Sequence, residues 1–486
     1  MINTNQRSAQ SAEKLARTTW PASTRCWALN LAVVGQVVLV VACSLVPRFE
    51  GVNGGVDTIN APPRLSNAHG PLTAKQSKLI LDKLRRETPD ADVLGRHLAF
   101  TQAISDSPLT VGNKVTLLRD GEASFRAIFR VIQGAKEHIN LEYFTFEDVE
   151  QDGRHLADLL VEKQAAGVQI NIIYDSAGSR STPQALFDRL KQAGVNSLQF
   201  NPIDPFQAKT GYSLNNRDHR KLLIVDGATA IIGGVNISQV YSSNVFSSDA
   251  SKDAKARDFW RDTDLQLEGP AVADLQRLFL DTWARQRGDP LKQSNFFPEN
   301  KGTGNQVVGV IGSTPTRAVP IYYITLLSAI RNAESRIWLT TAYFVPTHQE
   351  LEDMIDAARR GVDVRLMLPS HSDSGSALNI GRSHYADLLK AGVKVYEIRD
   401  VILHSKTAVI DSVWSVVGSS NFDGRSVLFD DEVDAVVLGR ETGAQMETAF
   451  EDDLANSDEI DRQTWSKRPL SQKMREAFSR VWSYWL

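Results

Sequence analysis

The chain has 486 residues, of which 42% are hydrophobic and 23% are charged. This composition excludes an intrinsically disordered, a collagen-like or a small disulfide-stapled protein. With 54 Lys and Arg against 58 Asp and Glu, the net charge of −4 argues against a protein that binds nucleic acid over its whole surface. The two cysteines, Cys26 and Cys43, both lie near the start, so the main body has neither a disulfide framework nor a cysteine-based metal site.

An apolar segment without charges covers residues 26–47, and as a helix it would span roughly 33 Å, enough to cross a bilayer. Basic residues are concentrated in residues 1–25, so the positive-inside rule predicts a cytoplasmic N-terminus and a body on the outer side of the membrane. The run Val40-Val41-Ala42-Cys43 also resembles a bacterial lipobox, in which Cys43 would be acylated after cleavage. Both interpretations, a transmembrane helix and a lipoprotein signal, tether the body to a membrane.

The body contains two copies of one pattern. In both halves a strand, a helix and a second strand are predicted in the same order, over 138–144, 156–167 and 168–174 and again over 336–339, 351–361 and 362–368. A further helix in each half ends on Ala-Gly-Val, at 193–195 and 391–393. Strands that alternate with helices predict an α/β fold with two pseudo-twofold-related sheets, mixed or mostly parallel, flanked by helices.

The repeat extends to polar residues, which packing alone does not require. Each member of the first set recurs as the same residue type 185 residues later, the two sets being His219, Lys221, Asp226 and Asn236, and His404, Lys406, Asp411 and Asn421. Each His and Lys begins a strand-like run, so their side chains are expected on one face. Small residues, Gly233-Gly234 and Gly418-Ser419, come before each Asn, and we expect them to let a ligand approach the backbone.

Two such units around a twofold axis would place two imidazoles, two ammonium groups and two amides around one pocket that suits a phosphodiester. One imidazole can attack phosphorus, while the other acts as general acid for the leaving alcohol and then as general base for the acceptor. The lysines and asparagines can stabilise the phosphoryl oxygens, so neither a metal nor another cofactor is expected. A metal site at the histidines is disfavoured because a lysine follows two residues after each one.

Acidic residues are predicted to have two different roles around this pocket. Asp262 and Glu432 are the candidate carboxylates that orient the two imidazole rings. Asp226 and Asp411 fall near strand ends, so we expect them to be structural.

The motifs HRKLLIVD with GGVNIS, and HSKTAVID with GSSNFDGRS, resemble those of the phospholipase D superfamily over about residues 111–462. The segments GSSNFDGRSVLFDDE, AYFVP, WRDTD and WSKRPLSQKMREAF resemble bacterial cardiolipin synthases in particular. This resemblance implies a duplicated phospholipase D-like fold, with His219 as the residue that forms a phosphatidyl-enzyme and His404 as the acid and base. It also implies phosphate binding by Lys221, Lys406, Asn236 and Asn421, and an orienting role for Glu432. Asp430 and Ala342 stand where these synthases usually have Asn and Pro.

The sequence therefore predicts a phosphatidyltransferase of the bacterial inner membrane that makes cardiolipin from two phosphatidylglycerol molecules and releases glycerol. If water resolves the intermediate, the enzyme is instead a phospholipase D that forms phosphatidic acid. A phosphodiesterase acting on nucleic acid and a non-catalytic lipid-binding protein are the remaining alternatives. The expected partners are the membrane, phosphatidylglycerol and other phospholipids, and not nucleic acid; the sequence does not indicate whether an accessory protein is required.

The C-terminal tail, 463–486, carries five basic residues against Glu476, with apolar residues at helical spacing. This pattern predicts an amphipathic helix that lies on a bilayer or packs on the protein's own core. The predicted parts of the chain are a basic segment 1–25, the apolar segment 26–47, a linker 48–71, a helical lead-in 72–110, a first phospholipase D-like unit 111–295, a linker 296–305, a second unit 306–462 and the tail 463–486.

Overall fold

The computed structural model describes residues 65–87, 95, 97, 101, 108–204, 213, 215–242, 259–300, 302–315 and 320–481, all within the unit Arg48–Leu486. The predicted membrane segment 26–47, with Cys43, lies outside the described residues. Within the part of the chain that is described, no helix combines the length and the apolar character needed to cross a bilayer.

The first half of the body is a mixed sheet with helices packed on it. Its elements in chain order are β3 (Leu109–Arg119), α5 (Asp120–Gly134), β4 (His138–Tyr143), β5 (Glu150–Gln151), β6 (Arg154–His155), α6 (Leu156–Ala165), β7 (Gln169–Asp175), α7 (Gln184–Gln192), β8 (Asn196–Phe200), β9 (Arg217–Asp218), β10 (Lys221–Val225), β11 (Thr229–Gly233), η3 (Gln239–Tyr241), β12 (Trp260–Arg261), β13 (Thr263–Glu268) and α8 (Val272–Arg285). The strands lie in the order β8-β7-β4-β10-β11-β13-β3, in which the neighbouring pairs β8–β7 and β7–β4 are parallel and the other pairs are antiparallel.

The second half repeats this arrangement. Its elements are β14 (Gln306–Ser313), α9 (Ile321–Arg331), β15 (Arg336–Thr341), β16 (Phe344–Val345), α10 (His348–Arg359), β17 (Asp363–Pro369), α11 (Gly375–Ala391), β18 (Lys394–Ile398), β19 (Ile402–Leu403), β20 (Lys406–Ile410), β21 (Trp414–Gly418), β22 (Phe422–Asp423), α12 (Gly424–Leu428), β23 (Asp430–Leu438), α13 (Arg440–Leu454), β24 (Ser457–Glu459), α14 (Arg462–Ser466) and α15 (Leu470–Val481). The order β18-β17-β15-β20-β21-β23-β14 matches the first sheet strand for strand, and β24 extends it. The predicted duplication is confirmed.

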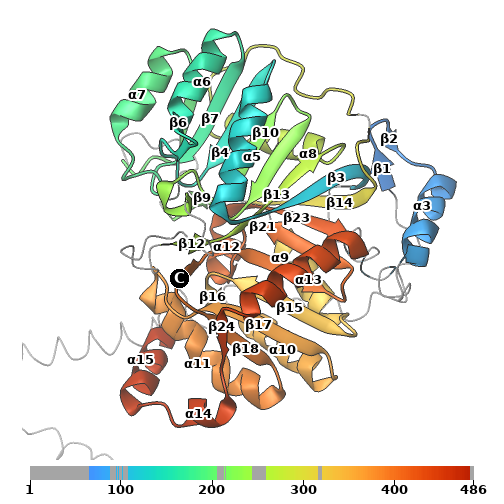
Figure 1. Ribbon diagram of the computed structural model, residues 1–486, viewed down its shortest axis with the longest axis vertical. Helices are drawn as coiled ribbons and strands as arrows, with labels where there is room; N and C mark the ends of the chain where they lie inside the picture. The colour runs from blue at the N-terminus through green and yellow to red at the C-terminus, as the bar shows by residue number, and fades with distance from the viewer. Residues whose placement is uncertain are drawn as a thin grey trace, which may run out of the picture. The chain divides into compact units, whose positions relative to one another are not determined.

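The two sheets join through their equivalent edge strands, β3 and β14, which pair antiparallel. Figure 1 shows the first half, in cyan and green, above the second half, in yellow to red, with these strands side by side between them. Each half has its own apolar core. A third core is built by both halves, with Ile232 and Leu265 from the first and Val417 and Val433 from the second. The halves are therefore held together by apolar burial.

The structure corrects two expectations. The sheets are mixed and mostly antiparallel, because β10 and β11, like β20 and β21, are joined by short hairpins and not by helical crossovers. The linker predicted over 48–71 ends in an ordered hairpin, β1 (Leu65–Asn67) and β2 (Gly70–Pro71), whose Leu65 is fully buried and which pairs with β3. The predicted lead-in contains α3 (Ala74–Glu87).

Candidate active site

Both histidines of the repeated motif line one cavity of about 440 Å³ at the junction of the halves, together with Asn236 and Asn421. The strands β10 and β20 begin at the lysines, so each histidine lies in the segment just before its strand. Both strands sit inside their sheets, between two hydrogen-bonded neighbours, which fixes the backbone that leads to each histidine. The structure thus brings the two predicted motifs together.

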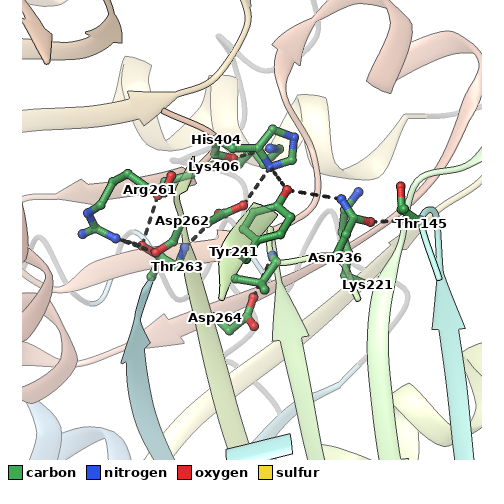
Figure 2. A network of polar contacts seen from close by, with 12 residues as sticks. Thr145, Lys221, Asn236, Tyr241, Arg261, Asp262, Thr263, Asp264, His404 and Lys406 are labelled. Carbon is green, nitrogen blue, oxygen red and sulfur yellow. Dashed lines mark hydrogen bonds and ion pairs between the residues drawn. The ribbon is translucent and has the colours of Figure 1, made fainter. Parts of the chain in front are cut away.

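Each imidazole is hydrogen-bonded by a carboxylate from the opposite half. His404 Nδ1 lies 2.7 Å from Asp262 Oδ2, and His219 Nδ1 lies 3.1 Å from Glu432 Oε1. Figure 2 shows the first of these pairs. All four residues are at least nine-tenths buried. When Nδ1 carries the proton and donates the hydrogen bond to the carboxylate, Nε2 is left with a free lone pair. Nε2 is then the atom that can attack a substrate.

Main-chain hydrogen bonds also connect each histidine to the opposite half. The amide of His219 donates to the carbonyl of Asp431 (2.9 Å), and the amide of His404 donates to the carbonyl of Arg261 (2.8 Å). In both cases the accepting residue comes directly before the orienting carboxylate. Each histidine is therefore held in register with its carboxylate by a main-chain hydrogen bond as well as by the side-chain contact.

Both lysines are buried, and each ammonium donates a hydrogen bond to the backbone carbonyl of the histidine two residues before it. Burial, with repulsion from Lys406, lowers the pKa of Lys221 to about 7. Burial lowers the pKa of Lys406 to about 8. The site is thus built to receive negative charge, because an anion placed beside the two ammonium groups stabilises their charged forms.

Burial and the neighbouring charges also shift the pKa values of the two imidazoles and of Glu432. Burial, then repulsion from Lys406, lowers the pKa of His404 to about 4, against the attraction of Asp262. Burial and the charge of Lys221 hold the pKa of His219 well below its usual range. Burial raises the pKa of Glu432 to about 7, although Lys221 opposes that rise. These lowered pKa values favour the neutral form of both imidazoles at pH 7.

Tyr241 is a cavity residue that sequence reasoning missed. Its hydroxyl lies 3.1 Å from His404 Nδ1 and accepts a hydrogen bond from Asn236 Nδ2 (3.4 Å). The other end of that amide, Asn236 Oδ1, accepts from the backbone amide of Thr145 (3.1 Å), as Figure 2 shows. These hydrogen bonds orient Asn236 and connect it through Tyr241 to His404. No repeat marks Tyr241, because the residue at the same offset in the second half is Ser426.

The small residues before each asparagine make room for carboxylates, and not for a ligand as the sequence suggested. A Cβ on Gly234 would lie 2.1 Å from Asp262 Oδ1, and one on Gly418 would lie 2.0 Å from Asp434 Oδ1. In the second half Ser419 takes the place of Gly234 and donates a hydrogen bond to Glu432. The glycines are thus required by the orienting carboxylates and their neighbours.

Asp264 and Asp434 form a second pair of equivalent acids that the sequence analysis did not single out. Each follows its orienting carboxylate by two residues and pairs across the sheet with the equivalent glycine, Gly233 or Gly418. Burial raises the pKa of Asp264 to about 7 and the pKa of Asp434 to about 8.

Asp226 and Asp411 are placed away from the cavity, at the turns that follow β10 and β20. Asp226 accepts hydrogen bonds from the backbone amides of Lys136, Glu137 and His138. Asp411 accepts from the equivalent amides of Glu334, Ser335 and Arg336 and contacts His97 Nε2 at 3.3 Å. Each carboxylate thereby holds the start of the neighbouring strand, β4 or β15.

One group of possible metal ligands is found among the described residues. Donor atoms of His219, Asp430 and Glu432 all lie within 4.8 Å of one another. Two of these residues already bond each other, and the Lys221 charge acts on both. A divalent cation would meet that positive charge, so the group fits an anion-binding site better than a metal site.

Comparisons with known proteins agree with the duplication. The sequence profile of the family described as "Cardiolipin synthase, PLD-like domain" matches residues 128–246 and 326–454, one stretch in each half. A cardiolipin synthase of Geobacillus sp. (strain WCH70) is 33% identical over 399 residues, which cover 80% of this chain and 76% of the relative. A probable cardiolipin synthase of Bacillus subtilis (strain 168) is 31% identical over 418 residues, covering 83% of this chain and 80% of the relative.

Among solved structures, the phosphatidylserine synthase of Haemophilus influenzae Rd KW20 matches with a TM-score of 0.60 at 13% identity, covering 80% of this chain and 98% of that chain. At this identity the match shows a shared fold. The sequence matches at about 30% identity, over most of both chains, show the family. The chain belongs to the cardiolipin synthase family of the phospholipase D superfamily.

Proposed function

We propose that this protein is a phosphatidyltransferase that makes cardiolipin from two molecules of phosphatidylglycerol and releases glycerol. One observation carries the proposal: two histidines, each oriented by a carboxylate from the opposite half, line a single cavity. The names of the relatives supply the substrate class, since the same chemistry could serve other phosphodiesters. A purely lipid-binding protein would not need both oriented imidazoles.

In the first step, Nε2 of His219 attacks phosphorus of the first lipid, a P–N bond forms, and the P–O bond to the headgroup glycerol breaks. His404 donates a proton to the departing glycerol oxygen. Burial, then repulsion from Lys406, lowers the pKa of His404 to about 4, so its protonation depends on the negative charge that the bound phosphodiester brings.

In the second step, a hydroxyl of a second phosphatidylglycerol attacks the phosphatidyl-histidine. His404, now neutral, accepts the hydroxyl proton, a P–O bond forms, and the P–N bond to His219 breaks. Lys221, Lys406, Asn236 and Asn421 stabilise the charge on the phosphoryl oxygens in both steps. Water in place of the second lipid would give phosphatidic acid, the phospholipase D outcome.

We also infer that the reaction takes place at the membrane surface, with residues 26–47 as anchor, the N-terminus in the cytoplasm and the body outside. Helix α15 supports a membrane location because Leu470, Met474 and Phe478 recur every four residues and are 72%, 65% and 69% exposed. Basic residues flank this apolar stripe, as is typical of helices that lie on anionic bilayers.

The test is to incubate the purified protein in detergent with labelled phosphatidylglycerol and to separate the lipid products. Cardiolipin with free glycerol is expected. Phosphatidic acid as the sole product would replace the synthase by a phospholipase D. His219→Ala and His404→Ala should each abolish glycerol release, whereas His155→Ala, whose side chain is 49% exposed and outside the cavity, should not.

A further inference from the structure

The product of the proposed reaction carries two phosphates joined by one glycerol. When the second lipid attacks, its own phosphate must therefore lie within one glycerol of the phosphorus on His219, inside or at the edge of the same cavity. The groups already assigned to the reacting phosphate, two lysines and two asparagines, cannot serve both anions. The cavity needs a second anion-binding group close to His219.

Two permanent cations are found among the described residues that line the cavity, Arg217 and Arg425. Both stand outside the repeated His-Lys-Asn set. Arg217 lies two residues before His219, is 6% exposed, and is held by Asp175 (3.6 Å), Ser176 (3.0 Å) and the carbonyl of Asn201 (3.2 Å). Its guanidinium is thus mostly committed to the wall of the first half.

Arg425 is better placed for a ligand. It belongs to α12, follows Asn421 by four residues, and its side chain is 31% exposed. Nη1 and Nη2 donate to the side chain and the carbonyl of Asn215 (3.0 and 2.9 Å), and Nε lies 3.2 Å from Asp430 Oδ2. These contacts, made to both halves of the chain, fix the guanidinium at the cavity while leaving part of it open.

The charge of Arg425 reaches the reacting groups. It is one of the cations that depress the pKa of His219. Its partner Asp430 does not cancel it fully, because burial, with repulsion from Glu432 and Asp423, holds the pKa of Asp430 well above its usual range. A guanidinium also offers paired N–H donors that match two oxygens of a phosphodiester.

We propose that Arg425 binds the phosphodiester of the acceptor lipid and so directs the phosphatidyl-enzyme to a second lipid in preference to water. This inference rests on the proposed function and goes beyond it, since it names the group that selects an anionic acceptor. Both outcomes break the same P–N bond on His219 and deliver the acceptor proton to His404. Arg425 changes only which hydroxyl, from lipid or from water, is held in line with that bond.

The experiment compares product ratios in detergent micelles of labelled phosphatidylglycerol. Removing Arg425 alone would leave Asp430 buried without its cation, so Arg425→Ala is made in an Asp430→Asn background and compared with Asp430→Asn itself. The ratio of cardiolipin to phosphatidic acid should fall by about tenfold, the worth of one charge-assisted contact. Arg425→Lys, which keeps the charge but loses the paired donors, should give an intermediate ratio.

A neutral acceptor separates acceptor binding from general damage. With 1-propanol added, the ratio of phosphatidylpropanol to phosphatidic acid should be the same in Asp430→Asn and in the double variant, because propanol has no phosphate. Arg359→Ala, at an exposed arginine paired with Asp356, should match the wild type in both ratios.

An unchanged cardiolipin ratio in the double variant would overturn the inference while leaving the synthase intact. A propanol ratio that falls as far as the cardiolipin ratio would overturn it as well, because Arg425 would then exclude water without recognising phosphate. Failure of the wild type to release glycerol from phosphatidylglycerol would instead refute the proposed function itself.

Discussion

Neither histidine is oriented by its own half of the chain. His219 and Glu432 are 213 residues apart, and His404 and Asp262 are 142 residues apart. An imidazole whose Nδ1 is bonded to a carboxylate is held in one tautomer and one orientation, which a nucleophile and a general acid both require. An oriented imidazole therefore exists only when both halves are folded against each other.

Glu432→Gln and Asp262→Asn test this orienting role. An amide keeps the shape of the side chain but can present an N–H to Nδ1, which stabilises the wrong tautomer. We expect kcat for glycerol release to fall by about 10²–10⁴-fold, with a much smaller change in KM. Steady-state kinetics on micelles measures both, and thermal unfolding checks that each variant is folded. A rise in KM with kcat intact would contradict an orienting role.

Asp411 is expected to contribute to stability and not to chemistry. Burial alone raises the pKa of its carboxyl, but hydrogen bonds from His97 and the amides of Ser335, Arg336 and Glu334 outweigh burial and lower the pKa from 3.8 to about 2. Because the folded-state pKa is the lower one, this contribution is present above about pH 4 and is lost as the pH falls through about 2. It amounts to about 2 kcal/mol.

Asp411→Asn should therefore lower the free energy of unfolding at pH 7 by about 2 kcal/mol, and by less at pH 3. Urea unfolding of wild type and variant at the two pH values measures the difference. A destabilisation that is equally large at both pH values would show that the ionised carboxylate is not its source.

The repeat in the sequence located the histidines, lysines and asparagines because duplicated polar residues at equal spacing have no packing explanation. It could not show which carboxylate bonds which imidazole, since that pairing depends on contacts between the halves. Asp264 and Asp434 were missed for a related reason. They are equivalent in the sheet, but 170 residues separate them instead of 185, so an equal-offset search does not align them.

Helix α15 buries a charged residue and exposes apolar residues, which reverses the usual arrangement. The helix packs on α11, and its inward-facing Glu476 is 2% exposed and bonded to Arg468 (2.7 Å). Its apolar residues Leu470, Met474 and Phe478 point outward. The sequence predicted an amphipathic helix but left open whether its apolar stripe packs on the protein. The structure places a carboxylate inward and this stripe on a largely exposed face of the helix, which the proposed membrane would contact.

A fluorescent probe can identify that environment. In a background without Cys26 and Cys43, Met474→Cys is labelled with an environment-sensitive dye, and so is Leu79→Cys, a site on α3 that is 61% exposed. Vesicles containing phosphatidylglycerol should shift the emission at position 474 to the blue and leave position 79 unchanged, because of the two labelled helices we expect α15 alone to insert. Equal responses at both positions would contradict insertion of α15, and a blue emission at 474 before vesicles are added would mean that protein covers the stripe.

Most strands and helices were predictable from their apolar periodicity, including β4, α6 and β7 and their counterparts β15, α10 and β17. The direction of the remaining strands was not predictable in this way. The alternation of strands and helices suggested that helical crossovers connect all strands in parallel. The Asp226-Gly227 pair, with φ of 53° and 60°, is the hairpin signal that could have corrected this. The β1–β2 hairpin escaped notice because its strands are only three and two residues long.

At the scale of the whole molecule, one chain builds one complete site. The equivalent edge strands β3 and β14 pair with each other, a shared apolar core lies between the sheets, and both orienting carboxylates cross from half to half. A single half would expose this core and would carry an unoriented histidine. The duplication therefore supplies within one chain the two imidazoles that the proposed reaction requires.

Mixing two inactive variants tests whether the site is complete within each chain. Chains with His219→Ala keep only the acid and base, and chains with His404→Ala keep only the nucleophile, so each should be reduced by roughly 10³-fold or more in cardiolipin formation. If every cavity is built by one chain, a mixture of the two, or their co-expression, should give no more activity than the sum of the separate proteins. Restored activity would mean that halves from different chains pair through β3 and β14, as an exchange of equivalent units would allow. Size-exclusion chromatography of the mixture would then show a species larger than the single chain. If the mixture stays inactive and no such species is found, both histidines of each site belong to one chain.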